Sequence, residues 1–218
     1  GEVVSVIEPL SAFIALTTRT TLDSDDFTRA NNADLGVEWD AGYTNIYSTV
    51  DPFTLNTNAI RVTTLSRDTI ETFNGTTPAA NQWAQITFPT IATATSSVRA
   101  GGVLLRAGAP GALNGYDCRA FSWTGGTRAR IARWTNGSIV TLAEDTTITW
   151  ASGDILRFEA EGSNLRCYRN DVLIVSATDT TYASAGKTGL IHIVASAATT
   201  DMTMDSFVMG GFTNTSNY

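Results

Sequence analysis

The feature that most constrains the fold is a series of short runs of β-branched, aromatic and aliphatic residues, separated by clusters of Gly, Asn, Asp and Ser. Runs of this length and spacing are typical of β-sandwiches and jelly rolls. No window shows the apolar period of 3.6 residues that marks an amphipathic helix. Thr, Val and Ile are frequent, and their branched side chains fit a pleated surface. We therefore predict an all-β protein with little helix.

Two hairpins are predicted in the second half of the chain. Asn136-Gly137 separates the strand-like runs 128–134 and 138–143. Asn-Gly favours a hairpin turn because both residues tolerate a positive φ. Residues 162–164 separate the runs 154–161 and 165–169 in the same way. Each pair of runs is expected to form two antiparallel neighbours.

Alternation along a strand assigns each side chain to one of two faces. Between residues 116 and 169, the set predicted to point inward is small or apolar: Cys118, Ala120, Leu156, Phe158, Ala160, Leu165 and Cys167. The opposite set combines charges and rings: Asp117, Arg119, Phe121, Trp123, Arg157, Glu159, Arg166 and Tyr168. Alternation places Tyr116 on the same face as Cys118. Because Tyr116 begins its strand, however, alternation does not fix its direction. We predict a sheet face covered by alternating charged groups and rings.

Length and charge narrow the classes of protein. A chain of 218 residues is long enough for the core of one β-sandwich. The formal net charge of −7 argues against nucleic acid and anionic membranes as partners. No apolar run reaches the ~18 residues of a membrane-spanning helix. The opening sequence GEVVSVIEPL carries an acid where a secretory leader carries bases, so we expect synthesis in the cytoplasm without a signal peptide.

Residues 1–22 are predicted to be an N-terminal arm or a first strand. Two apolar clusters in this segment are separated by Pro9, which breaks any single regular element. Exposed clusters of this kind promote aggregation, so we expect at least one of them to be buried between subunits. The residues of this predicted assembly arm are Val3, Val4, Ile7, Phe13, Ile14 and Leu16.

Several motifs, taken in their order, resemble concanavalin A-like (LamG-type) jelly-roll domains. They are Asp25-Asp-Phe-Thr-Arg-Ala-Asn31, Leu35-Gly36 with Trp39, Ser152-Gly-Asp-Ile-Leu-Arg-Phe-Glu159, Asn164-Leu-Arg-Cys-Tyr-Arg-Asn170, Val172-Leu-Ile-Val-Ser176, Asp179-Thr-Thr-Tyr182, Gly186, Gly189-Leu190 and Met204-Asp-Ser-Phe207. The resemblance covers residues 23–212 and leaves 213–218 as a C-terminal tail. It implies an antiparallel jelly-roll sandwich of two stacked sheets. The family includes lectins, binding modules and phage virion proteins, so the fold alone does not give the function.

The catalytic motifs of enzymes on this fold are missing. Glycoside hydrolases of this type carry a Glu-x-Asp-x-x-Glu strand, and none is present. Glu159 and Glu161 share a face, but Arg157 lies beside them and favours ionised carboxylates, so we predict structural ion pairs. Gln85-Ile-Thr87 lacks the His of the Gln-Ile-His strand of alginate lyases. We predict no enzymatic activity.

The single histidine and the two cysteines are predicted to be structural. His192 lies between apolar residues in a predicted strand, so we expect it to be packed or hydrogen-bonded. Cys118 and Cys167 both point inward, and a disulfide needs Cα atoms within about 7 Å. In a reducing compartment, two buried thiols are favoured over a disulfide, although the sequence leaves both alternatives open.

Three acids are candidates for a calcium site. Asp25, Asp26 and Asp205 lie in motifs at opposite ends of the predicted domain, and its first and last strands could bring them together. Carboxylates are ligands that calcium prefers. The alternative is turn and cap chemistry, which uses the same residue type. No other cofactor is predicted.

Rings and arginines form the candidate ligand face. Tyr and Trp could stack on sugars, and with Arg they are also typical anchors of protein interfaces. The candidate residues are Arg106, Tyr116, Arg119, Trp123, Arg157 and Tyr168. The sequence leaves a glycan face and a covered protein interface equally open.

The function predicted first is that of a non-enzymatic virion structural protein, a phage capsid decoration or tail surface protein. The resemblance to a family with phage surface members supports it. Its partners would be other virion subunits or further copies of this chain in a homo-oligomer, at the virion surface. The alternative is a carbohydrate-binding module or lectin that recognises surface glycans through the aromatic and Arg residues.

Overall fold

The structure is a computed structural model, and it describes residues 16–32, 34–40, 43, 53–61, 67–91, 98–123, 125–194 and 202–215. Every regular element in these residues is a strand. The described part of the chain contains no helix long and apolar enough to cross a membrane. The strands are β1 (Leu16–Asp25), β2 (Trp39–Asp40), β3 (Thr54–Asn56), β4 (Ala59–Arg61), β5 (Arg67–Phe73), β6 (Gln82–Ile91), β7 (Arg99–Ala107), β8 (Gly115–Trp123), β9 (Gly126–Thr135), β10 (Ser138–Asp145), β11 (Ile155–Glu161), β12 (Asn164–Arg169), β13 (Val172–Thr178), β14 (Lys187–Val194) and β15 (Met202–Thr215).

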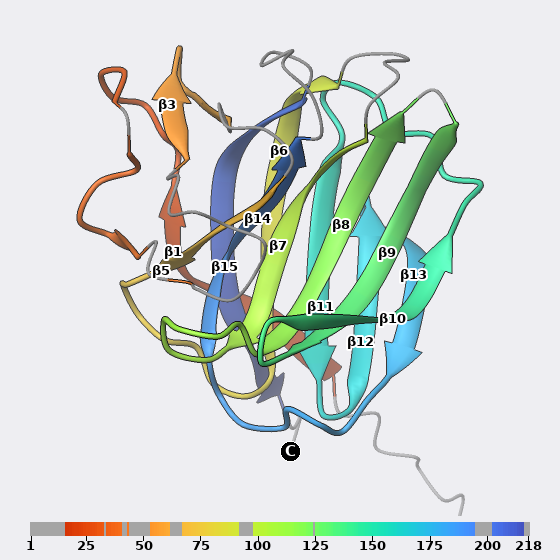
Figure 1. Ribbon diagram of the computed structural model, residues 1–218. Coiled ribbons are helices and arrows are strands. Elements are labelled where there is room, and N and C mark those ends of the chain that lie inside the picture. Colours follow the sequence, from red (N-terminus) through yellow and green to blue (C-terminus); the bar gives the residue numbers. More distant parts are fainter. Residues whose placement is uncertain are drawn as a thin grey trace, which may run out of the picture.

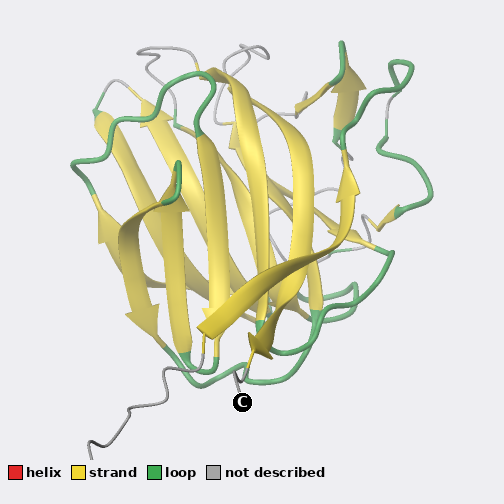
Figure 2. Ribbon diagram, turned by 180° about the vertical axis from the view of Figure 1, so that it is seen from behind, coloured by secondary structure: helices red, strands yellow, loops and turns green. Residues whose placement is uncertain are grey.

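These strands form two antiparallel sheets that stack face to face (Figure 1). The front sheet has the order β10-β9-β8-β7-β14-β5-β2. The back sheet has the order β13-β12-β11-β6-β15-β4-β3, and β1 also pairs with β15. Figure 2 shows the back sheet from its outer side. The predicted all-β, two-sheet antiparallel sandwich is confirmed.

Both predicted hairpins are present. β9 and β10 pair across Asn136 and Gly137, whose φ angles of 48° and 76° are both positive. β11 and β12 pair in register from Leu156 with Arg169 to Glu161 with Asn164. Local turn chemistry therefore sets both registers.

The main core lies between the two sheets. The residues that alternation assigned to the inside are all buried in one apolar cluster, including Cys118 and Ala120 of β8 and Leu156, Phe158 and Ala160 of β11. The other strands contribute residues such as Phe88, Val103 and Phe207. The inner faces thus supply the apolar burial that drives the two sheets together.

A disulfide joins the two sheets through this core. Cys118 of β8 is bonded to Cys167 of β12, with the two Cα atoms 6.5 Å apart. The expectation of two buried thiols was therefore wrong. β8 belongs to the front sheet and β12 to the back sheet, so their inward-pointing cysteines face each other across the core within bonding reach.

The N-terminal segment is described only from residue 16. Val3, Val4, Ile7, Phe13 and Ile14 lie outside the described residues, and Leu16 begins β1. β1 pairs with β15 from Leu16 opposite Thr215 to Asp25 opposite Phe207. Residues 16–22 are therefore part of the back sheet, and residues 213–215 of the predicted tail belong to β15. The role of the arm in assembly stays a prediction.

Glu71 and His192 are among the ionisable side chains buried in the core. Glu71 of β5 accepts a hydrogen bond from the backbone N–H of Phe53 at 2.7 Å, and burial raises its pKa to about 7. His192 is fully buried, its Nε2 lies 3.2 Å from the carbonyl oxygen of Met202, and burial lowers its pKa to about 4. His192 is therefore packed and hydrogen-bonded, as the sequence predicts.

Glu71 and His192 should give opposite pH dependences of stability. The contribution of Glu71 to the free energy of unfolding is fully present below its unfolded pKa of 4.5 and is lost as the pH rises through about 7. The contribution of His192 is complete above 6.5 and is lost as the pH falls through about 4. Relative to wild type, the free energy of unfolding of Glu71→Gln should increase by about 3 kcal/mol as the pH rises from 4.5 to about 7. That of His192→Gln should increase by a similar amount, relative to wild type, as the pH falls from 6.5 to about 4. Urea unfolding at several pH values gives the free energy of unfolding of wild type and of both variants as a function of pH. If these three curves run parallel, the two side chains do not have these shifted pKa values.

The disulfide should contribute measurably to stability. Replacing both Cys118 and Cys167 by Ala removes a cross-link across 49 residues and leaves no unpaired thiol. Loss of such a cross-link typically costs about 2–5 kcal/mol. Thermal unfolding of the double variant should start at a lower temperature, and a reducing agent should lower the unfolding temperature of wild type but not of the variant. An equal effect of the reducing agent on both proteins would contradict this.

Candidate functional site

The residues predicted to form one ligand face lie in three separate places. Arg157 and Tyr168 lie on β11 and β12 of the back sheet, whereas Arg119 and Trp123 lie on β8 of the front sheet. Arg106 and Tyr116 lie at one end of the front sheet, near the connection after β13. The prediction of a single shared face was wrong because alternation gives the face of a strand but not the sheet to which it belongs.

On the back sheet, the charges of the outer face pair with one another. The guanidinium of Arg157 lies 4.3 Å from the ring centre of Tyr168, and its Nε donates to Glu159 at 2.8 Å. Arg166 donates to Glu161 at 2.7 Å and lies 3.6 Å from Glu159. The ion pairing predicted for both glutamates is confirmed. These groups are occupied with structural contacts.

On the front sheet, Arg119 points away from the main core but is almost completely buried. It forms ion pairs with Asp68 and Asp117, and the latter also accepts a hydrogen bond from Trp134 Nε1 at 2.9 Å. The predicted direction of Asp117 and Arg119 is correct, and both side chains are buried on this outer face. A second apolar cluster, which includes Leu104, Trp134 and Ile191, lies on this outer face.

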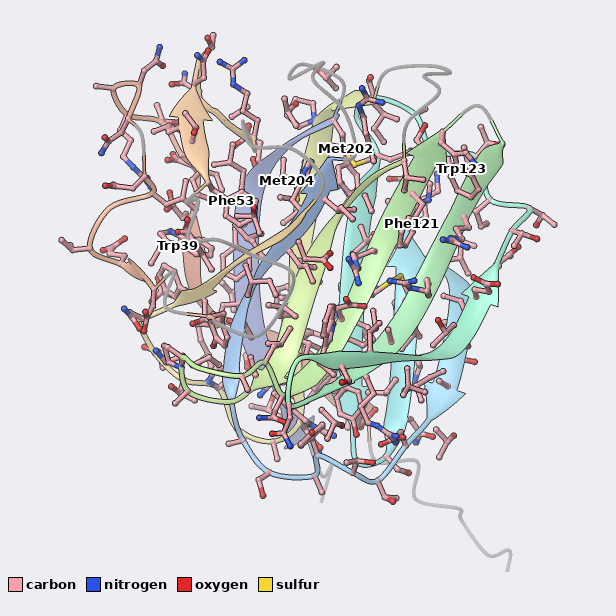
Figure 3. All side chains as sticks on the ribbon, in the orientation of Figure 1. Trp39, Phe53, Phe121, Trp123, Met202 and Met204 are labelled. Carbon is pink, nitrogen blue, oxygen red and sulfur yellow. A yellow bond between two sulfur atoms is a disulfide. The ribbon has the colours of Figure 1, made fainter. Side chains whose placement is uncertain are left out.

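Arginines and rings form a ladder along β8 and β9 of the front sheet. The guanidinium of Arg128 lies 4.5 Å from the ring centre of Phe121 and 5.1 Å from that of Trp123. Arg130 lies 4.7 Å from the ring of Phe121. Figure 3 shows Phe121 and Trp123 towards the same end of β8. Arginines therefore already contact both rings. Phe121 is buried, whereas Trp123 is half-buried and stays partly open to a ligand.

A cavity of about 320 Å³ lies at the end of the sandwich where the connections after β7 and β13 meet (lower end of Figure 1). This volume is at the small end of the range for ligand pockets. Its walls combine one cation, one ring, several small residues and several polar groups. The lining residues are Arg106, Ala107, Gly108, Asn114, Thr181, Tyr182, Ala183, Ser184 and Ala185.

A second cavity, of about 340 Å³, carries a weaker case. It is lined by Ile148, Arg169, Asn170, Val172 and Ile174. The guanidinium of Arg169 is already paired with Asp154 at 2.7 Å, and Asn170 also donates to this carboxylate. The polar groups of this second cavity are thus committed to the protein itself, and the cavity beside Arg106 is the better candidate.

The backbone at Arg106 has an unusual conformation. β7 carries one more residue than β14 between two paired positions, Ala107 with Lys187 and Leu104 with Gly189, which is a β-bulge. Arg106 has a φ of 51°, and its N–H donates to Gln82 Oε1 at 2.7 Å. Only a glycine fits at position 186, because a Cβ there would lie 2.6 Å from the backbone carbon of Arg106. The bulge directs the side chain of Arg106 to the cavity wall.

The guanidinium of Arg106 is held by carbonyl groups. Its Nε donates to the carbonyl of Ala80 and its Nη1 to that of Tyr182, both at 2.8 Å. Nη2 has no hydrogen-bond partner in the described part of the chain, and no described carboxylate forms an ion pair with this residue. The side chain is nearly inaccessible, and burial lowers its pKa. Arg106 therefore brings a positive charge to the cavity wall without a neutralising partner among the described residues.

Tyr116 and Asp179 hold the backbone of the cavity residues Thr181 and Tyr182 in place. The hydroxyl of Tyr116 donates to Asp179 at 2.7 Å and accepts from the backbone N–H of Tyr182 at 2.9 Å. Asp179 also forms an ion pair with Arg133. The ring of Tyr182 packs edge-on against that of Tyr116 at 5.6 Å. Tyr116 is thus a buried positioning residue, and burial raises the pKa of its hydroxyl to about 12.

Sequence reasoning missed most of the cavity residues. Asn114, Thr181, Tyr182 and Ser184 were not candidates, although residues 179–182 belong to a motif of the resemblance. The available signal was the run of small residues 183–186 next to a tyrosine, which leaves space beside a ring. Its pairing with Arg106 depends on the spatial neighbourhood of β7 and β14, which no local pattern gives.

The acids proposed for calcium are used in other ways. Asp25 accepts from Arg29 at 2.6 and 2.9 Å, from Trp39 Nε1 at 2.8 Å and from the N–H of Phe27 at 2.8 Å. These donors hold its pKa below the usual value despite burial. Asp26 accepts from the N–H of Thr28, and Asp205 from that of Ser206. Within the described residues, no group of three or more His, Cys, Asp or Glu could hold a metal ion.

No known family profile and no curated protein matches the chain. Solved structures do match its fold. The carbohydrate-binding module CBM66 from Bacillus subtilis is 18% identical with a TM-score of 0.55, over 79% of this chain and 94% of that chain. The CBM2 module of an evolved Dit from Lactobacillus casei BL23 phage J-1 is 13% identical with a TM-score of 0.60, over 93% of this chain and 98% of that chain.

A GlcNAcα1-4Gal-releasing endo-β-galactosidase from Clostridium perfringens also matches. It is 12% identical with a TM-score of 0.57, and the match covers 92% of this chain and 64% of that chain. At such identities the likeness shows the fold alone. The fold is a concanavalin A-like jelly-roll sandwich, the architecture of lectins and carbohydrate-binding modules.

The buried ion pair between Asp117 and Arg119 should stabilise the fold more than an exposed ion pair does. Asp117→Ala leaves Arg119 with one carboxylate partner and Trp134 without an acceptor, and breaking a buried pair typically costs about 3–5 kcal/mol. The matched control is Glu144→Ala, which removes the more exposed pair with Arg128 and should cost less than about 1 kcal/mol. Denaturant unfolding compares the two variants. Equal losses would show that Asp117 contributes no more than a surface charge.

Proposed function

We propose that this protein is a non-catalytic carbohydrate-binding domain whose ligand occupies the cavity beside Arg106. The observation that carries the proposal is the cavity itself, which presents a buried cation, a tyrosine ring and hydroxyl groups around a space of about 320 Å³. A few placed polar groups in a small concave site are typical of small-ligand recognition. The fold, shared with carbohydrate-binding modules, supports a saccharide as the ligand.

The composition of the cavity wall supports binding without catalysis. Glycoside hydrolysis commonly requires two carboxyl groups on either side of the scissile bond. The residues that line the cavity include no Asp, Glu or His. The nearest carboxylate that contacts its wall, Asp179, already binds Tyr116 and Arg133, and these contacts contribute to holding its pKa low, where a general acid would need it high.

A virion surface role is the second candidate. It rests on the similarity to the phage Dit module, which spans nearly all of both chains. Such a role is compatible with carbohydrate binding, because a phage surface protein can recognise glycans of its host. Mass spectrometry of purified virions from the source of this gene tests it. Absence of the chain from the particles would exclude this role and leave the binding proposal unaffected.

A blocking substitution tests the carbohydrate site. Ser184 is exposed on the rim of the cavity, so Ser184→Trp should fill the space without touching the core. The matched control is Thr146→Trp, an exposed position beyond the far end of β10. A glycan array followed by calorimetry should show binding to wild type and to Thr146→Trp, and at least ~10-fold weaker binding to Ser184→Trp, in line with lost pocket contacts.

Two outcomes would contradict the proposal in different ways. If no glycan binds even at high surface density, the protein is not a carbohydrate-binding domain. If glycans bind wild type and Ser184→Trp equally, the site lies elsewhere, and Trp123→Ala then tests the partly open end of the front-sheet ladder.

A further inference from the structure

We propose that the cavity selects acidic saccharides and binds a sugar carboxylate against the guanidinium of Arg106. The inference rests on the proposed function, because it names the class of glycan that the same site takes. It goes further in assigning a charge to the ligand. Four observations carry it: the unpaired guanidinium, the charges around it, the space beside it and the size of the cavity.

The first observation is the unpaired guanidinium. Buried charges in proteins are normally paired, since removing a charge from water costs several kcal/mol. Arg106 is 4% exposed, its Nε and Nη1 donate only to carbonyls, and its Nη2 has no partner in the described residues. Arg119, equally buried, pairs with two carboxylates. The wall of this cavity therefore lacks the anion that a buried arginine normally has.

The second observation is the local charge balance. Arg133 and Asp179 neutralise each other at the edge of the cavity, so Arg106 leaves one net positive charge there. The chain as a whole has a formal net charge of −7. An anionic ligand is thus repelled by most of the molecule and attracted at this point, which favours binding in one place and one orientation.

The third observation is that the backbone is built to keep space next to this side chain. Arg106 adopts a φ of 51° in the bulge of β7, a conformation that costs free energy in a non-glycine residue. Gly186 and Gly115 both approach its backbone too closely for a Cβ. Ala107, Gly108, Ala183 and Ala185 then line the cavity with the smallest side chains. These small residues therefore keep free space beside the buried Arg106 side chain.

The size and the single charge favour a carboxylate over a phosphate. A phosphomonoester carries nearly two charges at neutral pH, whereas the cavity offers one net positive charge. A carboxylate matches that charge and the planar geometry of a guanidinium. The ring of Tyr182 and the hydroxyl group of Ser184 remain for the sugar itself, whereas Thr181 Oγ1 already accepts a hydrogen bond from Arg133 at 2.9 Å. Uronic acids and sialic acids are saccharides with this chemistry.

The ligand provides the sharpest test, because changing it leaves the protein intact. Oligosaccharides that contain glucuronic, galacturonic or sialic acid are compared with the same compounds after reduction of the carboxyl group to an alcohol. Wild type should bind at least one acidic compound and bind its reduced counterpart ~10–100-fold more weakly, as expected for a charge-assisted hydrogen bond. Arg106→Gln should lose affinity for the acidic compound by a similar factor, so that it no longer binds the acidic compound more tightly than the reduced one.

Each result supports or overturns the inference. Equal binding of acidic and reduced compounds, abolished in Ser184→Trp, would overturn it while the proposed carbohydrate site stands. Equal or tighter binding of a sulfated neutral oligosaccharide would also overturn the assignment to a carboxylate. Absence of binding by every glycan would remove the proposed function and the inference with it. If Arg106→Gln fails to fold, the comparison of acidic and reduced compounds on wild type still decides.

Discussion

The structure depends on the burial of two inner sheet faces against each other. Each strand turns every second side chain towards the opposite sheet, and these side chains form one continuous apolar cluster. Because this face must stay apolar, the ionisable groups of the sandwich concentrate on the outer faces and at the ends, where they pair with one another or with rings. Glu71 and His192 are among the exceptions, and burial shifts the pKa of each towards the neutral form.

The sequence predicts what is local. The two hairpins and the inward set were correct because turn chemistry and alternation act over a few residues. Membership of a sheet is not local. Alternation places both Trp123 and Tyr168 on the side of their strand opposite to its cysteine, yet β8 and β12 lie in opposite sheets. The cysteines of these strands were expected to be thiols because synthesis in a reducing compartment was assumed. Sequence could not show whether the two strands come close, and the sandwich brings the cysteines into bonding distance.

The candidate site could be predicted only in part. Arg106 was a candidate because it is an arginine in a clearly predicted strand. The alternation of side chains, however, does not predict the β-bulge at this position. Leu104 and Ala107 both lie in the outer cluster of the front sheet, which requires one extra residue between them. That irregularity, and the contact of Arg106 with the connection after β13, arise from the pairing of β7 with β14. Both are properties of the assembled sandwich.

The disulfide has a topological consequence. Residues 118–167 form a covalently closed ring that contains β9, β10 and β11 and the crossing from the front sheet to the back sheet. A protease that cuts the exposed part of this ring, in the connection after β10, would produce a nick but no separate fragment. The disulfide would keep the two pieces joined through the core, so the two sheets would stay linked even after the connection between β10 and β11 is cut. The sandwich is thus tied together at its centre rather than only by its connections.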